Sequence, residues 1–136
     1  MENKDVRWFQ RFQNFSRAFA LLSEITNYDA EQMENLQKEG FIQRFEIVFD
    51  LAWKTVKDYL EYLGHDVQPS PRPVIKMAFE AGIIKDGQAF INMLAARNAM
   101  SHTYDEESFA NIFTQIKDEF FPALRKLYVF LKKETS

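Results

Sequence analysis

The segment FIQRFEIVFDLAWKTVKDYLEYL, residues 41–63, decides the fold. Its apolar residues recur at the three- and four-residue spacing of a helix: Phe45, Phe49, Ala52, Val56, Tyr59 or Leu60, and Leu63. Gly64 follows directly and favours the left-handed conformation that ends helices. The pattern predicts a long helix with one apolar face, which has to be buried against other helices.

The segments before it extend the pattern towards the N-terminus. Residues 6–26 predict a helix, and Phe9 widens its apolar face. The buried stripe of this helix comprises Trp8, Phe12, Phe15, Phe19 and Leu22. Asn27 and Asp29 favour a turn or a helix start, and residues 30–39 predict a short helix or an irregular connection that breaks at Gly40.

The segments after it predict three more helices. One begins at Ser70-Pro71 and runs to Ala81, where Gly82 stops it. The expected inner face of this helix comprises Ile75, Ala78 and Phe79. Asp86 is the expected cap of the next helix. One face of that helix carries Phe90, Met93, Leu94 and Arg97. The last helix spans about 105–133, with a kink expected near Asp118–Phe121 because Pro122 lacks an N–H.

Composition limits the classes of protein. The 136 residues fit one domain, residues 1–136, and four Gly and four Pro are too few for a turn-rich β fold. The chain has no Cys, its first residues are polar, and no apolar run reaches the ~18 residues that cross a membrane. With a net charge of −3 it is no general polyanion binder. We expect a cytoplasmic, all-α, up-and-down antiparallel four-helix bundle with an additional short helix, and no membrane, metal or cofactor.

One octad, Arg97-Asn98-Ala99-Met100-Ser101-His102-Thr103-Tyr104, concentrates polar chemistry. Arg binds phosphate oxygens in a fork, and His moves protons near neutral pH. On one continuous helix Arg97 and His102 would point about 140° apart. They can meet at one ligand only if the helix ends between them, as a capping box from Thr103 to Glu106 predicts, or if a second copy completes the site.

Two further blocks accompany the octad. Residues 41–60 and Ser70-Pro-Arg-Pro-Val-Ile-Lys-Met-Ala-Phe-Glu-Ala-Gly82 resemble the nucleotidyltransferase substrate-binding proteins, a branch of the HEPN superfamily of small all-α domains. The pattern Arg-Asn-x-x-x-His-x-Tyr resembles the signature of that superfamily, so the likeness covers most of residues 40–110. It implies that the chain pairs with a minimal nucleotidyltransferase encoded nearby, while the many aromatic residues and the spacing within the octad predict a homodimer.

The resemblance leaves two functions open. In the first, the chain is a non-catalytic subunit that binds nucleotide or acceptor substrate in a groove at the dimer interface, lined by Arg97, Asn98, His102 and Tyr104. In the second, it is a metal-independent ribonuclease toxin in which His102 moves a proton and Arg97 stabilises the phosphate. Tyr104 is then the residue that the partner adenylylates to silence the toxin. The chain lacks the Gly-Ser with downstream paired Asp of a nucleotidyltransferase catalytic domain.

Structural alternatives stand beside these functions. Arg44 and Lys54 could line a nucleotide groove or belong to a solvated face. Glu46 and Asp50 are a like-charge pair, which indicates a nearby cation, either Lys54 or one from another helix. Arg97 could instead form a buried structural salt bridge, and His102 could stabilise a helix end. In that case the chain is a plain helical dimer.

Overall fold

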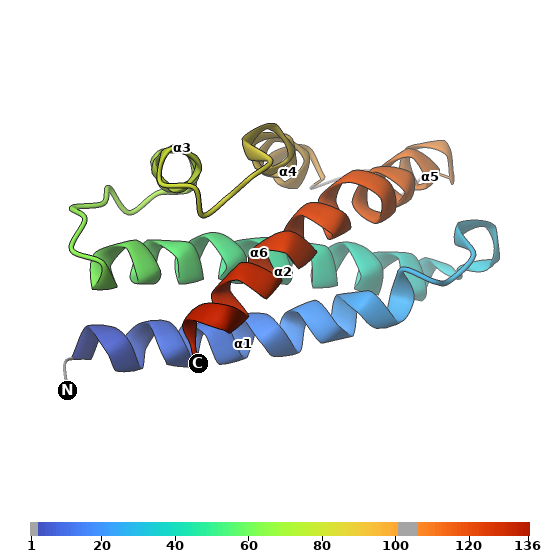
Figure 1. Cartoon of the computed structure of the whole chain (residues 1–136). Helices are drawn as coiled ribbons and strands as arrows, with labels where there is room; N and C mark the ends of the chain where they lie inside the picture. Colours follow the sequence, from blue (N-terminus) through green and yellow to red (C-terminus); the bar gives the residue numbers. More distant parts are fainter. Residues whose placement is uncertain (1–2, 101–105) are drawn as a thin grey trace.

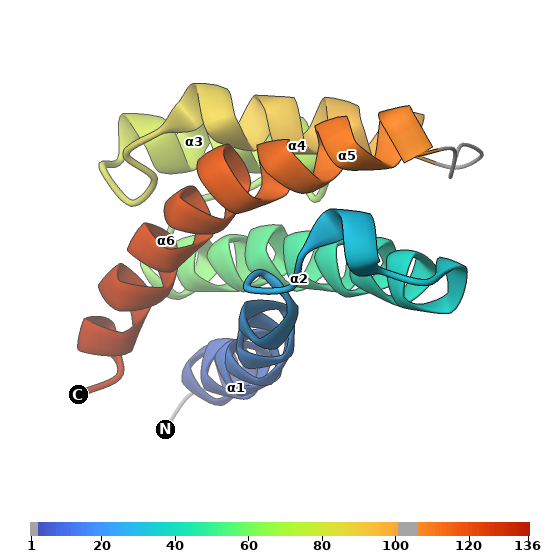
Figure 2. The ribbon, with the colours of Figure 1, turned by 90° about the vertical axis from the view of Figure 1, so that its right-hand side faces the viewer.

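The computed structural model describes residues 3–100 and 106–136, and all regular structure within them is helical (Figure 1). The elements are α1 (Asn3–Ile25), η1 (Ala30–Gln32), α2 (Asn35–Tyr62), α3 (Pro71–Glu80), α4 (Gly87–Ala99), α5 (Glu106–Gln115), η2 (Ile116–Phe120) and α6 (Phe121–Glu134). Both views place α2 in the middle, with α1 on one side and the α3 and α4 layer on the other (Figures 1 and 2).

Side-chain contacts fix the direction of each helix. Arg11 contacts Asp58 and Glu24 contacts Arg44, so α1 and α2 are antiparallel. The rod formed by α5, η2 and α6 runs with α2, because Phe41 stacks on Phe113 near one end and Tyr59 bonds to Glu134 at the other.

The direction of α4 completes the bundle. Asn92 contacts Glu119 of η2, and Met100, after α4, lines a pocket with Ser108 of α5, so α4 is antiparallel to the C-terminal rod. The four rods therefore alternate in direction, and α3 is the extra short helix. The predicted fold class is confirmed.

The core is built largely of aromatic rings. Trp8, Phe12, Phe15 and Leu22 of α1 are buried, and Phe19 stacks on Phe121 of α6 with the ring centroids 4.9 Å apart. The predicted stripes of α2 and of the C-terminal rod are likewise buried over most of their length. Rings of this size contribute most of the apolar area that stabilises a bundle.

Three predicted core positions are wrong. Phe9, Leu63 and Phe79 are exposed by 40%, 49% and 54%. Phe9 lies at the edge of the α1 stripe, where its ring packs against the ring of Trp8. Leu63 is the C-cap of α2, at the exposed end of that helix, while Phe79 lies over Gly87, where a Cβ would come to 3.0 Å from its ring.

The start of α2 also differs from the expectation. The break predicted at Gly40 is wrong, because α2 begins at Asn35 and continues through this glycine. Glu34 and Gln37 form a capping box there, with the Glu34 N–H donating to Gln37 Oε1 at 2.8 Å. A glycine inside a helix costs only about 1 kcal/mol, which this cap and the burial of α2 offset. Residues 30–32 form a short 3₁₀ turn capped by Asp29.

The predicted end of α2, both ends of α3 and the start of α4 agree with the structure. Pro71 is at the start of α3, Asp86 Oδ1 accepts the Ala89 N–H at 3.0 Å, and Gly64 and Gly82 have φ of 98° and 78°. The segment Asp118–Phe121, where a kink was predicted, overlaps the π-helical turn η2, after which the Phe121 N–H donates to Ile116 O. A proline cannot donate to the preceding turn, and the wider turn accommodates that loss.

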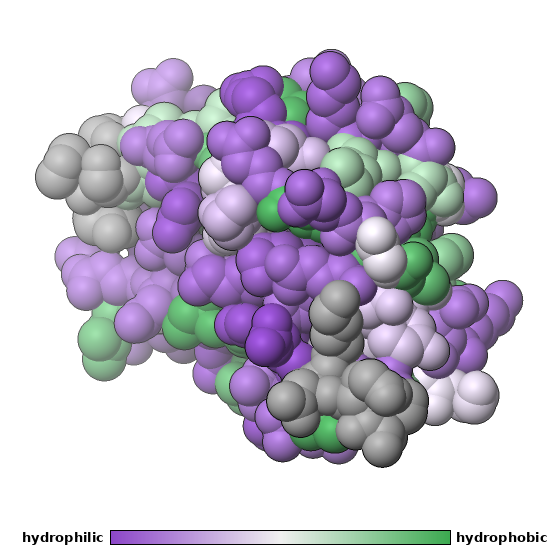
Figure 3. Space-filling model, turned by 90° about the vertical axis from the view of Figure 1, so that its left-hand side faces the viewer, coloured by the Kyte–Doolittle hydropathy of each residue, from purple (hydrophilic) through white to green (hydrophobic). Residues whose placement is uncertain are grey.

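The outer surface is mainly polar at the end of the molecule that carries the N-terminus. Figure 3 shows hydrophobic residues there as separate small spots. Among the described residues, none of the helices combines the length and the apolar character that crossing a membrane requires.

Candidate functional site

Arg97 lies in the last turn of α4 and reaches across to α2. Its Nη2 is 3.9 Å from Asp50 Oδ1, and its side chain is 38% exposed. Asp50 is about equally exposed, at 33%. The buried structural salt bridge considered for Arg97 is therefore not what forms. A long, partly exposed ion pair leaves the guanidinium accessible to an anion from solvent.

Asp50 is shared with a second cation. Lys54 Nζ lies 2.9 Å from Asp50 Oδ2, one helical turn along α2. The expectation that a cation relieves the repulsion between Glu46 and Asp50 is confirmed, and cations from both suggested sources contribute. We call Asp50, Lys54 and Arg97 the Asp50 cluster. It carries two positive charges and one negative charge on an accessible surface.

A shallow groove of about 480 Å³ lies beside the cluster. It is lined by Gln43, Glu46, Ile47, Asp50, Leu51 and Arg97. The groove thus offers one guanidinium among two carboxylates and apolar side chains. A phosphate could bind Arg97 in this groove once the guanidinium turns away from Asp50, whose own charge Lys54 partly neutralises.

Arg44 is not brought to this groove. Its Nη1 donates to the carbonyl oxygen of Leu21 at 2.6 Å and lies 3.4 Å from Glu24 Oε1. Arg44 and Asp50 are six positions apart on α2, which places them about 120° apart around the helix axis. Arg44 therefore contacts α1 and ties the C-terminal part of that helix to α2, whereas Lys54 and Arg97 contact Asp50.

The remaining residues of the octad are placed only in part. Asn98 is exposed on α4, next to Arg97. His102 and Tyr104 lie outside the described residues, as does the capping box expected at Thr103–Glu106. The meeting of Arg97 and His102 at one ligand therefore stays a prediction.

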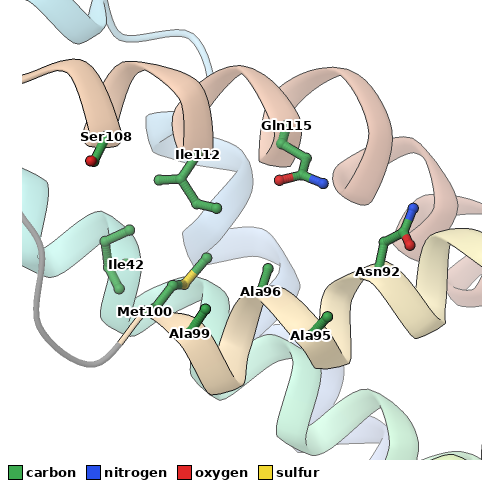
Figure 4. A pocket seen from close by; sticks show the side chains of 9 residues that line it. All are labelled: Ile42, Asn92, Ala95, Ala96, Ala99, Met100, Ser108, Ile112 and Gln115. Carbon is green, nitrogen blue, oxygen red and sulfur yellow. The ribbon is translucent and has the colours of Figure 1, made fainter.

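Sequence reasoning missed a second cavity, between α4 and α5. This α4–α5 pocket has a volume of about 400 Å³ (Figure 4). Its apolar lining includes Ile42, Ala96, Ala99, Met100 and Ile112, and its polar lining includes Asn92 and Gln115. The signal in the sequence was the group of small residues Ala95, Ala96 and Ala99 on one face of α4, where short side chains leave room beside the helix.

Glu119 organises the polar end of this pocket. Its Oε2 accepts the Asn92 amide N–H at 2.7 Å, and its Oε1 accepts the Gln115 amide N–H at 3.3 Å. Gln88 also donates to Asn92 Oδ1 at 2.9 Å. These bonds link α4 to α5 and η2 and fix how the two amides are oriented. Within residues 3–100 and 106–136, no three acidic or histidine side chains gather as a metal ion would need.

Comparison with known proteins places the chain in a family. Residues 10–133 match the family described as nucleotidyltransferase substrate binding protein like. The chain belongs to this family. The resemblance drawn from the three sequence blocks is thereby confirmed, and the match extends it over α1 and α6 as well.

Two individual proteins are similar to this family member. Probable ribonuclease HepT of Haemophilus influenzae is 30% identical over 83 residues, which are 58% of this chain and 57% of that protein. The matched part thus spans little more than half of the relative. A crystal structure of a protein from Thermus thermophilus superposes with a TM-score of 0.75 at 27% identity, covering 87% of this chain and 98% of that one.

Proposed function

We propose that this chain is the non-catalytic substrate-binding subunit of a two-protein system whose nucleotidyltransferase is encoded nearby. The observation that carries the proposal is the family match over residues 10–133. The sequence supports it, because the chain lacks the Gly-Ser and paired Asp that hold metal ions in a nucleotidyltransferase domain. The partner then supplies the chemistry, and this chain supplies contacts to the nucleotide or the acceptor.

The Asp50 cluster is the proposed phosphate-binding part of the site. Arg97 offers paired N–H donors, and Lys54 offers a compact charge on the same carboxylate. In the proposal two chains form a homodimer, and the grooves beside their clusters meet at its interface. Asn98, His102 and Tyr104 follow Arg97 closely in sequence and complete the groove.

Co-purification tests this function. The tagged chain and the small nucleotidyltransferase from the adjacent reading frame are expressed together and purified by the tag. We expect a stable complex, a dimer of this chain by light scattering, and no nucleotidyl transfer by this chain alone. A neighbour that elutes separately at micromolar concentrations would contradict the proposal.

A second function is favoured by one specific observation, the similarity to Probable ribonuclease HepT. In this alternative the RNA 2′-hydroxyl attacks the adjacent phosphate, forming a cyclic phosphate and releasing the 5′ oxygen. His102 of one chain takes the proton of the 2′-hydroxyl, His102 of the other copy in the homodimer gives a proton to the 5′ oxygen, and Arg97 stabilises the negative charge on the phosphate oxygens. Adenylylation of Tyr104 by the partner then silences the chain.

An RNA cleavage assay separates the two functions. The purified chain and its His102→Ala variant are incubated with RNA in the presence of a metal chelator. The ribonuclease function requires cleavage by the wild type and none by the variant. If the RNA survives both proteins equally, the substrate-binding function stands and the toxin function fails.

A further inference from the structure

The α4–α5 pocket has the size and lining of a small-molecule site. Cavities of about 300–1,000 Å³ with apolar walls and a few fixed polar groups are typical of such sites, and this one measures about 400 Å³. Its walls come from Ala96, Ala99 and Met100 on one side and Ile112 on the other, with Ile42 of α2 beneath (Figure 4). Short side chains opposite branched ones leave a slot suited to a flat ring.

The polar end of the slot has a defined hydrogen-bonding character. Glu119 holds the amide nitrogen of Gln115, so the carbonyl oxygen of the same amide turns the other way. In Figure 4 this oxygen points towards the side of the pocket where Ile112 and Ala96 lie. The pocket therefore presents a fixed acceptor, and the ligand that suits it is an apolar plane with an N–H donor on its edge.

The carboxylate that fixes both amides lies in the π-helical turn η2. η2 begins directly after Gln115 and contains Glu119, so the irregular turn sets the carboxylate between α4 and α5. Turns of this kind inside α-helices are frequent at functional sites.

We propose that the α4–α5 pocket is the base subsite for the nucleotide ligand and that it prefers a base with an amino group on its edge, as in adenine, over one with an oxygen there. The exocyclic N6 amino group donates to Gln115 Oε1, and the purine ring lies against Ala96, Ala99 and Ile112. The pocket opens to solvent, so ribose and phosphate can extend out of it. This inference rests on the proposed function for the ligand being a nucleotide, and it adds which base is recognised and where.

The test uses the full chain and two nucleosides that differ at the group in question. Adenosine carries the amino group at C6, whereas inosine carries an oxygen there, which would face the oxygen of Gln115. Binding is measured by isothermal titration. We expect adenosine to bind about tenfold or more tightly than inosine, since an unmatched polar edge is strongly rejected. Equal binding of the two nucleosides, or no binding of adenosine at millimolar concentration, would overturn the inference.

Variants locate the site. Ala99→Phe fills the pocket from an exposed position, and Ala110→Phe makes the same change at an exposed position of α5 that does not line it. We expect Ala99→Phe to abolish adenosine binding and Ala110→Phe to leave it unchanged, with both proteins folded by circular dichroism. Gln115→Leu should remove the preference for adenosine over inosine. Adenosine binding that survives Ala99→Phe places the ligand elsewhere and overturns the proposal.

The failure of this inference is distinguishable from failure of the proposed function. A wild-type chain that captures its nucleotidyltransferase but binds no adenosine loses only the adenine subsite. A chain that binds adenosine in the pocket but captures no neighbour keeps the subsite and loses the role as a subunit. Binding of the partner that is blocked by Ala99→Phe, with no nucleoside bound, would make the pocket a protein contact and refute the inference.

Discussion

Arg97 extends from α4 to a carboxylate on α2 without being buried there. Its guanidinium lies 3.9 Å from Asp50, and both side chains are about one third exposed. Solvent screens such a pair, so its contribution to folding is small. The ion pair of Arg97 with Asp50 therefore contributes little to the stability of the bundle.

The variant Arg97→Ala tests whether the ion pair with Asp50 contributes to stability. We expect the free energy of unfolding in urea to fall by less than about 1 kcal/mol, because exposed ion pairs contribute no more than that. Arg72→Ala, which removes an exposed arginine from α3, is the matched control. A loss of more than about 2 kcal/mol for Arg97→Ala alone would favour the structural alternative, in which the octad is a helix cap and the chain a plain scaffold.

Asp58 shows the opposite case, a charged residue held inside the fold. Its side chain is fully buried, Arg11 Nε lies 2.9 Å from it, and Lys57 Nζ lies 3.4 Å from it. Asp58→Ala would leave these cations facing a site without a counter-charge, and we expect a loss of about 2–3 kcal/mol. That is less than for a fully buried pair, because Arg11 is 34% exposed.

Asp66→Ala is the matched control for Asp58→Ala. Asp66 is exposed in the loop between α2 and α3, so its removal should change stability by less than about 0.5 kcal/mol. Urea unfolding of both variants gives the comparison. If the two midpoints coincide, Asp58 contributes nothing specific and the packing of α1 on α2 rests on its aromatic residues alone.

At the scale of the helices, two glycines should respond oppositely to the same substitution. Gly40 lies inside α2 with nothing within 4 Å of the position that a Cβ would take, so Gly40→Ala should stabilise by about 0.5–1 kcal/mol. Gly82 ends α3 with φ of 78°, a conformation that alanine avoids, so Gly82→Ala should destabilise by about 1 kcal/mol or more. Thermal melting of the two variants gives the sign of each change. A shift in the same direction would contradict either the continuous α2 or the left-handed end of α3.

Hydrophobic periodicity and helix-end residues predicted most helices correctly, because both depend only on residues that are close together in the sequence. Pro71, Asp86, Gly64 and Gly82 act on the backbone next to them, so their effects can be derived from local sequence. The break at Gly40 was wrong because the capping box at Glu34 and the burial of α2 outweigh one glycine. Local signals cannot show how much a helix gains from distant partners.

In the candidate site, too, contacts within one helix could be predicted from the sequence and contacts between helices could not. The contact of Lys54 with Asp50 is one turn along a helix, so the sequence could predict it. Arg97 on Asp50, Arg44 on α1 and the buried Asp58 depend on which helix packs beside which, and a single-helix pattern does not contain that information. The α4–α5 pocket likewise forms only where two helices meet.

At the scale of the whole molecule, the end of the chain is tied to the central helix by one hydrogen bond. The Tyr59 hydroxyl, near the end of α2, donates to Glu134 Oε1 of α6 at 3.0 Å. The contact spans the bundle between its two longest rods, and Tyr59 also packs on Trp8 of α1. Three helices therefore meet at one phenol. Burial, together with this bond to a carboxylate, raises the pKa of Tyr59 from 10.0 to about 12.

This raised pKa predicts how stability changes in alkali. Between pH 10 and 12 the folded chain keeps the Tyr59 proton while the unfolded chain releases it, so unfolding becomes easier as pH rises. The contribution of the phenol is complete below pH 10 and is lost as pH rises through about 12. Tyr59→Phe cannot titrate, so its stability should fall less steeply over this range, although it starts lower at pH 7 by about 1 kcal/mol for the lost hydrogen bond. Urea unfolding at pH 7, 10 and 11 measures both slopes, and Glu134→Gln should lie between them, because it keeps an acceptor without the charge. Parallel slopes for wild type and Tyr59→Phe would show that the phenol does not couple proton release to the docking of α6.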